Sequence, residues 1–295
     1  MSSSLVIKRL VLLAGSVLML LYVLAPVAWL LSSSLQREAD ITSIPPHWIP
    51  HPPALSSFKA IVAASFGTAS DDVNAAFIPS TAQYLLPALR NSLVVAAAVV
   101  VLNLLVSVPA AYAMAKIRYI GRDLSVYFML ATRVIPDIAL VVPFFLFVRK
   151  LGLLDSVGAL IVTYLAITIP FSVFMLLSYF ESLPDELDKA ARVDGCSRIQ
   201  TMLKVFLPLA LPSLVAVILF TFLTSWNEFL FALMFTQTAA SQTVPIIVAS
   251  FTSDFTTSFS FINAAGVVAI VPPVIIAVVF ERYIVSGLTA GAVKG

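Results

Sequence analysis

The sequence predicts an all-α integral membrane protein with six transmembrane helices, both termini in the cytoplasm and a polar cytoplasmic loop between helices four and five. Of its 295 residues, 60% are hydrophobic and 11% are charged, whereas about a quarter of the residues in a soluble domain are charged. The mean hydropathy is +1.04. The apolar residues form continuous runs, which disfavours a lipid-facing barrel of alternating strands.

Six runs reach the roughly 20 apolar residues that a bilayer core requires. The first run follows Lys8 and Arg9, is longer than the apolar core of a secretory signal and has no clear small-residue cleavage site after it. We interpret it as a retained helix, and a cleaved signal is the alternative. The six expected helices cover residues 10–31, 88–115, 124–148, 157–180, 210–235 and 264–284.

The basic residues predict the orientation, because Lys and Arg collect on the cytoplasmic side of a membrane. With the N-terminus inside, eleven of them fall on cytoplasmic segments and five on external ones. Arg149 and Lys150 fall on the external side, against the rule. The net charge of +2 is too small to indicate nucleic-acid binding. The single cysteine, Cys196, excludes an intrachain disulfide.

Three parts are expected along the chain. Residues 1–31 hold the N-terminal segment and first helix, 32–87 an extracytoplasmic loop, and 88–295 a core with five membrane helices, a cytoplasmic loop at 182–208 and a cytoplasmic tail at 287–295.

The external loop begins with a proline-rich stretch that favours extended or turn backbone. A short helix is expected near Leu55 to Ala64. The loop either docks an external partner or packs on the membrane face, and the sequence leaves both open. His47 and His51 are four apart, but the prolines around them argue against the helix that a metal site of this spacing needs. No metal site is expected.

The polar loop between the fourth and fifth runs predicts two short helices. Pro184 fits a first helical turn. Asp185, Glu186 and Asp188 follow it, where a helix N-terminus is electropositive. The first helix should run to about Asp194.

Local signals mark the end of this helix and the start of the next. Gly195 supplies the left-handed backbone that ends a helix, and Ser197 and Gln200 have the spacing of a capping box. Pro208 and Pro212 are expected to mark the junction between this second helix and the fifth membrane helix. The second helix should bury one stripe of apolar residues, namely Ile199, Met202, Leu203 and Phe206.

Polar groups inside the membrane runs are candidates for the substrate pathway. Glu228 must face a partner or a wet cavity, because a carboxylate in hydrocarbon is costly. A role in holding two helices together is favoured over contact with substrate. Arg133 and Asp137, four apart, either line a pathway or neutralise each other. Trp226 and Asn227 stand beside Glu228 as candidates, and Asn103 and Asn263 are weaker ones.

Prolines within the runs predict interruptions of the helices, as alternating access would require. The expected positions are Pro109, Pro136, Pro143, Pro170, Pro212 and the pair Pro272-Pro273.

One motif connects these features to a known family. Lys189-Ala190-Ala191-Arg192-Val193-Asp194-Gly195, followed after nine residues by Val205-Phe206-Leu207-Pro208, resembles the E-A-A, two residues, D-G, nine residues, I-x-L-P signature of the membrane subunits of bacterial ABC importers. Several other segments are similar to the maltose-type sugar permeases, over nearly the whole chain. They include Arg90-Asn91-Ser92, Trp226-Asn227-Glu228-Phe229 and the terminus 287–295.

The resemblance implies half of a transmembrane sugar pathway in a bacterial cytoplasmic (inner) membrane. The implied partners are a second permease subunit, two copies of an ABC ATPase and an extracytoplasmic binding protein that delivers the sugar. Loop 182–208 would be the coupling helix seated in the ATPase, and Gly291 and Lys294 of the tail would reach between the ATPase subunits. The implied coupling residues are Glu186, Lys189, Ala190, Ala191, Arg192, Asp194, Gly195, Leu207 and Pro208.

Lys189 departs from the family pattern, because it replaces the leading glutamate and reverses its charge. Asp185, Glu186 or Asp188 could substitute for that glutamate in an ion pair with the ATPase. Which of them does so stays open at this point.

The sequence predicts a transport subunit rather than an enzyme. None of the ten glycines starts the G-x-x-x-x-G-K-[ST] phosphate loop, so ATP hydrolysis is assigned to a partner, and no cofactor is expected. Two alternatives remain. One is an ABC permease for another solute, such as glycerol phosphate or a polyamine. The other is an ion-coupled secondary transporter that uses Glu228, Arg133 and Asp137.

Overall fold

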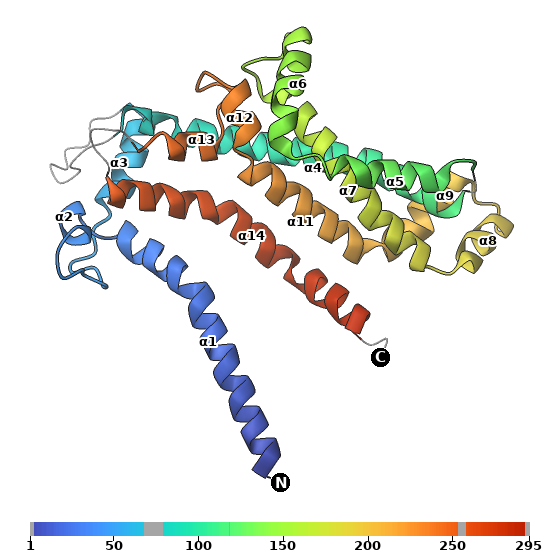
Figure 1. Ribbon diagram of the computed structural model, residues 1–295, viewed down its shortest axis with the longest axis horizontal. Coiled ribbons are helices and arrows are strands. Elements are labelled where there is room, and N and C mark those ends of the chain that lie inside the picture. The colour runs from blue at the N-terminus through green and yellow to red at the C-terminus, as the bar shows by residue number, and fades with distance from the viewer. Residues whose placement is uncertain (1–2, 68–78, 118, 253–257, 293–295) are drawn as a thin grey trace. The chain divides into compact units, whose positions relative to one another are not determined.

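The computed structural model describes residues 3–67, 79–117, 119–252 and 258–292, which are largely helical and contain no β-strand (Figure 1). This confirms the all-α prediction. Within the described residues, four helices are long and apolar enough to cross a membrane, or up to six if each of two bent helix pairs is one span. The four spans are Ile7–Ser34, Ser80–Lys116, Val157–Ser182 and Phe259–Tyr283.

The membrane run expected at 124–148 is divided into two helices, and the interruption expected at Pro136 is confirmed. Two helices, α5 (Arg122–Thr132) and α6 (Asp137–Lys150), take its place and meet at an angle of 98°. Pro136 stands between them with extended backbone (φ −67°, ψ 137°). The break follows from Pro136, because proline has no N–H to donate and disfavours helical backbone in the residue before it.

The expected helix at 210–235 is also interrupted. It is divided into α11 (Leu211–Asn227) and α12 (Leu230–Phe235), with Glu228 and Phe229 between them. A second bend, of 82°, precedes α11 at Ala210. The Glu228 carboxylate accepts hydrogen bonds from amides at the start of α12, and this compensates for the helical bonds lost at the break.

Most of the prolines do not interrupt their helices. Pro109 lies inside α4 (Leu85–Lys116), Pro143 inside α6, Pro170 inside α7 (Val157–Ser182) and Pro272-Pro273 inside α14 (Phe259–Ala292). Interruptions expected at these sites are therefore wrong. A proline removes only one hydrogen bond of the ladder and disturbs one carbonyl, and packed neighbours within a membrane protein tolerate such a loss. Of the expected positions, Pro136 does separate two helices, and Pro212 lies in the first turn of α11.

The chain divides into two compact units, Met1–Leu86 with Ile247–Val271, and Pro87–Ile246 with Pro272–Gly295. The first unit contains α1 (Ser3–Ser34), α2 (Glu38–Ile41), α3 (Ser56–Ser65), η1 (Ser80–Tyr84), the second half of α13 (Val244–Ala249) and the first part of α14. The helix expected near 55–64 is confirmed by α3. The proline-rich residues before it carry no helix, as predicted.

Side chains of α1 hold the proline-rich segment in place. The Trp29 and Trp48 rings meet edge to face with centroids 5.1 Å apart, and Gln36 Nε2 donates to the His47 carbonyl at 2.9 Å. Glu38 of α2 caps the start of α14 by accepting from the Phe259 and Ser260 amides, each at 2.9 Å. These contacts join the segment after α1 to both α1 and α14 within the first unit.

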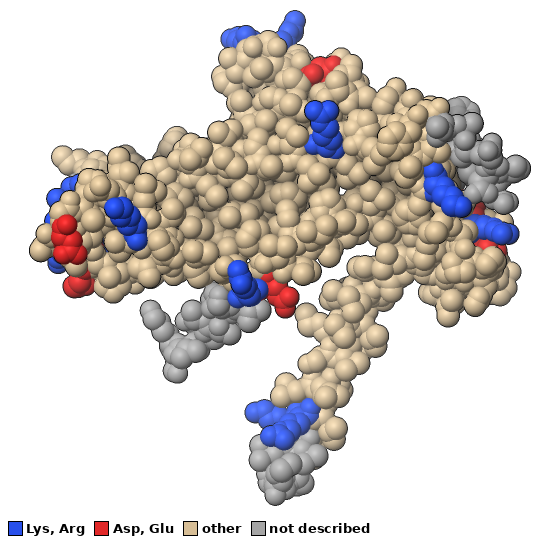
Figure 2. All heavy atoms as spheres, turned by 180° about the vertical axis from the view of Figure 1, so that it is seen from behind, with Lys and Arg blue, Asp and Glu red and all other residues tan. Residues whose placement is uncertain are grey.

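The second unit is organised around α7. Helix α11 packs along it, α5 covers one part of it, and α12 packs against both α6 and α7 (Figure 1). One apolar cluster gathers around Tyr164, Phe231 and Phe235, and a second around Phe180 and Phe206. On the face drawn in Figure 2, Lys, Arg, Asp and Glu are few and most of the surface is uncharged, as expected for a surface in contact with lipid.

Candidate functional site

Helix α8 (Asp185–Val193) begins and ends as the sequence predicts. Pro184 precedes it with extended backbone, and three acidic residues occupy its first turn. At its end, Gly195 has φ +82°. The Cys196 amide donates to the Ala191 carbonyl at 2.9 Å and the Gly195 amide to the Arg192 carbonyl at 3.1 Å. This is the Schellman pattern, which reverses the chain tightly.

The second helical segment opens with the predicted capping box. The Gln200 amide donates to Ser197 Oγ at 3.3 Å, and the Ser197 amide donates to Gln200 Oε1 at 2.9 Å. The segment runs through α9 (Arg198–Thr201), a π-helical turn η2 (Met202–Phe206) and α10 (Leu207–Leu209).

The expected apolar stripe on this second segment is only partly correct. Phe206 is fully buried, but Ile199 and Leu203 are 67% and 49% exposed. The π-helical turn contains an extra residue, which shifts the direction of the side chains after it relative to a regular α-helix. A 3.6-residue period therefore does not identify the buried face.

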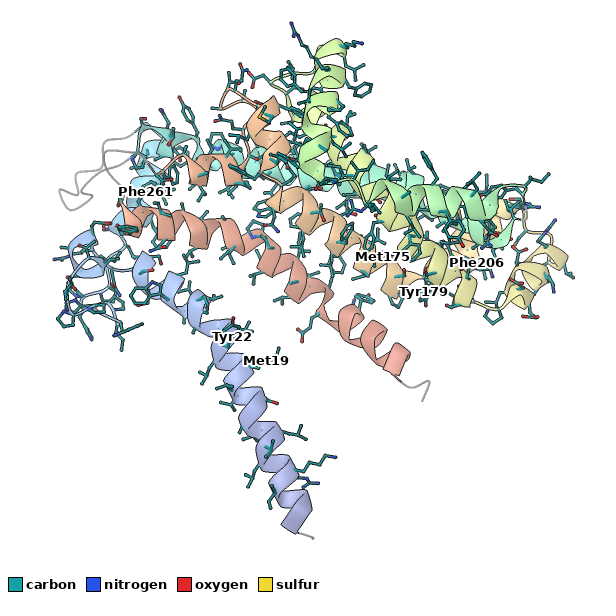
Figure 3. All side chains as sticks on the ribbon, in the orientation of Figure 1. Met19, Tyr22, Met175, Tyr179, Phe206 and Phe261 are labelled. Carbon is teal, nitrogen blue, oxygen red and sulfur yellow. The ribbon has the colours of Figure 1, made fainter. Side chains whose placement is uncertain are left out.

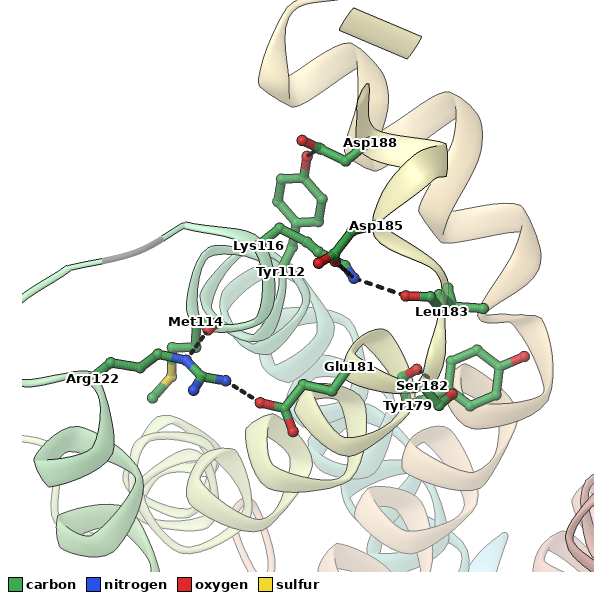
Figure 4. A network of polar contacts seen from close by, with 10 residues as sticks. All are labelled: Tyr112, Met114, Lys116, Arg122, Tyr179, Glu181, Ser182, Leu183, Asp185 and Asp188. Carbon is green, nitrogen blue, oxygen red and sulfur yellow. Dashed lines mark hydrogen bonds and ion pairs between the residues drawn. The ribbon is translucent and has the colours of Figure 1, made fainter. Parts of the chain in front are cut away.

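Two side-chain contacts hold α8 against the end of α4 (Figure 4). Tyr112 Oη donates to Asp188 Oδ1 at 2.8 Å. Lys116 Nζ donates to Asp185 Oδ1 at 2.7 Å and to the Leu183 carbonyl at 2.9 Å. The Lys116 side chain is 5% exposed, so its charge is largely withdrawn from water, which strengthens the attraction to Asp185.

An aromatic cluster lies beneath these contacts. The rings of Tyr112, Phe180 and Phe206 meet edge to face with centroids 5.3–6.3 Å apart, and Lys116 Nζ lies 5.4 Å from the centre of the Phe206 ring. Because these residues come from α4, α7 and η2, the cluster fixes the loop to two membrane helices. Nearby, Arg122 at the start of α5 donates to the Met114 carbonyl and pairs with Glu181 of α7 (Figure 4).

The opposite face of α8 is exposed. Glu186, Lys189 and Ala190 are exposed, and Val193 is 88% exposed, whereas Ala191 is buried on the inner face. Arg192, Asp194 and Pro208 are exposed, and Leu207 is partly buried. Since Asp185 and Asp188 bond within the chain, Glu186 is the acidic residue of the first turn whose carboxylate stays available for a partner.

Two of the candidate pathway residues are buried in the fold, and a third is partly buried. Trp226 is 3% exposed and stacks on Phe222 with centroids 5.6 Å apart. Asn103 is fully buried, and its amide donates to Thr168 Oγ1 at 2.9 Å.

Glu228 is the third of these candidate pathway residues. Its carboxylate accepts from Tyr164 Oη at 2.6 Å and from the Phe231 and Ala232 amides at 2.8 and 3.1 Å. These bonds hold α7 and α12 together, in agreement with the structural role that was favoured for Glu228.

The other pathway candidates, Arg133, Asp137 and Asn227, are exposed on this chain. Within the described part of the chain, Arg133 and Asp137 form no ion pair with each other. The expected mutual neutralisation is therefore wrong, because the 98° bend lies between them and removes the helical spacing that would bring them together. Both line a cavity of about 390 Å³ at the bend.

Sequence reasoning missed a second polar constellation, at the other end of the second unit. Asp155 has φ +56°, and its carboxylate accepts from the amides of Gln237 and Thr238 at 2.8 and 2.9 Å and from the hydroxyls of Thr238 and Ser241. These donors, the Ser241 hydroxyl first, hold the pKa of Asp155 well below its ordinary value.

Asn91 holds the same loop from α4. Its side-chain amide lies 3.3, 3.1 and 2.9 Å from the carbonyls of Ala239, Ala240 and Gln242. We define residues 236–243 as the clamped loop. The signal that could have found the clamp is a lone Asp in a turn, since Asp tolerates left-handed backbone and bonds to nearby main chain.

The expected tail contacts fall near the limit of the described chain. Gly291 lies in the last turn of α14, and Lys294 lies outside the described residues.

Comparison with known proteins assigns these features to one group. Residues 107–289 match the family described as binding-protein-dependent transport system inner membrane component. The chain is 38% identical over 272 residues to the sulfoquinovosyl glycerol transport system permease protein of Agrobacterium fabrum, covering 92% of this chain and 89% of the relative. It is 37% identical over 291 residues to the trehalose/maltose transport system permease protein of Thermococcus litoralis, covering 98% of each.

A solved structure has the same fold. A chain of a bacterial ABC transporter involved in the import of the acidic polysaccharide alginate aligns with a TM-score of 0.79 at 23% identity, covering 96% of this chain and 99% of that chain.

Proposed function

Because the chain belongs to the family of binding-protein-dependent transport system inner membrane components, we propose that it forms half of the transmembrane pathway of an ATP-driven saccharide importer in the inner membrane. The single observation that carries this proposal is the geometry of loop 182–208. One face of its helix α8 is bonded to α4, and the other face is exposed. Such a helix is suited to receive a soluble partner and to pass its motion to α4 and α7.

The saccharide class rests on the relatives. Their names assign sulfoquinovosyl glycerol to one and trehalose or maltose to another, and a diacetylchitobiose permease of Streptomyces coelicolor is 33% identical over 92% of this chain. A saccharide is therefore favoured over glycerol phosphate or a polyamine.

The partners follow from what this chain lacks and what it exposes. The sequence has no phosphate loop, so we assign ATP hydrolysis to two separate ATPase subunits, one of which docks on α8. A second permease completes the pathway, and an extracytoplasmic binding protein delivers the saccharide. The coupling contacts are assigned to Glu186, Lys189, Ala190, Arg192, Asp194 and Val193 on the accessible side of the loop.

The orientation is also part of the proposal. Lys116, Arg122, Glu181 and Asp185 gather at one end of the second unit, and Asp155 with the clamped loop at the other. The distribution of Lys and Arg favours the first end, and both termini, in the cytoplasm. The connections therefore alternate between the two sides as six membrane crossings require.

The test is ATP-dependent uptake by the assembled importer in lipid vesicles. We expect uptake of maltose or trehalose only when ATP, the ATPase and the binding protein are all present. Uptake by this chain alone would contradict the proposal and favour an ion-coupled secondary transporter.

A variant on the bare face of α8 tests the docking surface directly. Ala190→Trp adds bulk where the partner should sit, so we expect the ATPase to be lost from the purified complex. Leu124→Trp, on the exposed side of α5 (73% exposed), is the matched control and should retain the ATPase. Retention of the ATPase by Ala190→Trp would show that α8 is not the docking element.

A further inference from the structure

The bend between α5 and α6 borders a partly open cavity that the coupling loop does not use. Its volume is about 390 Å³, which is within the usual range for small-molecule sites. The residues on which the argument depends are Arg133, Asp137, Phe144, Ala166 and Ile167, which line it.

This cavity lies at a depth where water is otherwise excluded. Ile167 follows Val157, the first residue of α7, by ten residues, which at the helical rise is about 15 Å. The hydrocarbon core of a bilayer is roughly 30 Å thick. Arg133, whose Nη1 donates to the Ile167 carbonyl at 2.9 Å, is therefore about halfway through the membrane.

The charges in the cavity are not neutralised within the chain. Arg133 uses one N–H on Ile167 and places its guanidinium 5.9 Å from the centre of the Phe171 ring, so most of its five donors stay free. Asp137 makes no hydrogen bond or ion pair with any described residue. The start of α6 stabilises its charge but fills none of its acceptor sites. Groups like these at mid-membrane must face water, a partner or a ligand.

The unburied face of α7 extends from this cavity towards a second one. Ile167, Phe171, Ser178 and Ser182 follow one another at helical spacing and none is buried. The second cavity, of about 540 Å³, lies towards the end of α7 that carries Glu181, and Met175, Ser178 and Tyr179 are among the residues that line it. Figure 3 labels Met175 and Tyr179 at this level of α7. Phe171 packs on Phe220 of α11 with centroids 4.4 Å apart, between the two cavities.

We propose that Arg133 and Asp137 form a binding site for an uncharged saccharide halfway along the transport pathway. This inference rests on the proposed function. The Asp137 carboxylate accepts hydrogen bonds from two neighbouring hydroxyls, the free N–H groups of Arg133 donate to others, and Phe144 offers an apolar surface to the C–H face of the ring. Because the charges of Arg133 and Asp137 sum to zero, the pair offers an anionic saccharide no net attraction to offset the loss of its hydration, so the pair favours a neutral one.

Accessibility to water is the first test. In the assembled importer, with Cys196→Ser removing the native thiol, Ala166→Cys lines the cavity, and Ile138→Cys is a matched control beside Asp137 that does not line it. A membrane-impermeant thiol reagent reacts only with thiolate in water. We expect Ala166→Cys to react at least tenfold faster than Ile138→Cys. Equal rates would overturn the inference.

Protection by ligand is the second test. Maltose and trehalose should slow modification of Ala166→Cys, and sulfoquinovosyl glycerol, the anionic probe, should protect at least tenfold less well. Adding Arg133→Gln or Asp137→Asn should raise the half-protecting concentration of the neutral sugars at least tenfold, and Asp137→Asn should also reduce the preference against the anionic probe. Absence of protection by either neutral sugar, or no change in the variants, overturns the site.

The same vesicles separate this inference from the proposed function. ATP-dependent uptake together with an unreactive Ala166→Cys overturns the site alone. A reactive and sugar-protected site without any ATP dependence of uptake overturns the proposed function alone.

Discussion

Two connecting segments of the second unit are held in opposite ways. Loop 182–208 is held through side chains, since Asp185 and Asp188 on one face of α8 bond to Lys116 and Tyr112 of α4. Its own main chain is satisfied internally by the Schellman turn and the capping box. It is a preformed element attached by a few contacts.

The clamped loop 236–243 is held largely through its main chain. Asn91 bonds three of its carbonyls, and Asp155 accepts from two of its amides and two of its hydroxyls. Ser92 Oγ accepts the Val244 amide at 2.9 Å. Bonds to so many main-chain groups fix the conformation of the clamped loop relative to the helices around it. Loop 182–208 keeps its conformation through its own bonds, so it can move as a rigid body and transmit force through its few side-chain contacts. We therefore expect the α8 end to move and the end with the clamped loop to keep its shape.

The largest expected effect comes from the turn after α8. Gly195→Pro fixes φ near −65° where the chain needs +82°, and it removes the N–H that bonds the Arg192 carbonyl. We expect ATP-dependent uptake in vesicles to be abolished while the chain still inserts in the membrane.

Gly15→Ala is the control, because its added Cβ meets nothing within 4 Å. Normal binding-protein-stimulated ATP hydrolysis in Gly195→Pro would mean that the shape of this turn does not matter to coupling.

A smaller effect is expected from one tether. Tyr112→Phe removes the hydrogen bond to Asp188 but keeps the ring contacts with Phe180 and Phe206. Loss of such a bond costs about 1 kcal/mol, or roughly fivefold in a coupling equilibrium. Uptake and stimulated ATP hydrolysis should fall together by about that factor, as measured in vesicles.

Tyr127→Phe, an exposed tyrosine of α5 (69% exposed), should change neither rate. A loss of uptake with unchanged ATP hydrolysis would place Tyr112 in the pathway rather than in the coupling loop.

The contrast between the two segments also explains what the sequence could predict. Gly195, the Ser197–Gln200 capping box and α3 act within a few residues, and each was found from local spacing. The tethers of Asp185 and Asp188 join residues about 70 positions apart, so they were read only as charges at a helix start. The interruption at Pro136 was found from the proline itself, but the break at Glu228 was missed, because an apolar run sets the length of a span but not its continuity.

A third change addresses the clamp. Asp155→Asn keeps a residue that tolerates φ +56° but loses the charge that four donors share. After allowance for its exposure, the loss should be about 1 kcal/mol. The melting temperature of the purified complex should fall by about 2–4 °C, with uptake changed less than in Tyr112→Phe.

Asp155→Ala should cost more, because it also strains the left-handed backbone. Asp40→Asn is the control. Asp40 is partly buried on α2 of the first unit, and its substitution should leave the melting temperature unchanged. If Asp155→Asn reduces uptake more than Tyr112→Phe does, the proposed division between a moving and a static end is wrong.

The smallest effect is that of pH on the clamp. The pKa of folded Asp155 lies below its ordinary value, so its contribution to stability is complete above the unfolded pKa of about 3.9 and is lost as the pH falls towards the folded pKa. The difference in melting temperature between the native chain and Asp155→Asn should therefore stay constant from about pH 8 to pH 5 and shrink only below about pH 4. A difference in melting temperature that already shrinks between pH 7 and pH 5 would mean that a group other than Asp155 stabilises the clamped loop. The rigidity of this end of the second unit would then have another cause.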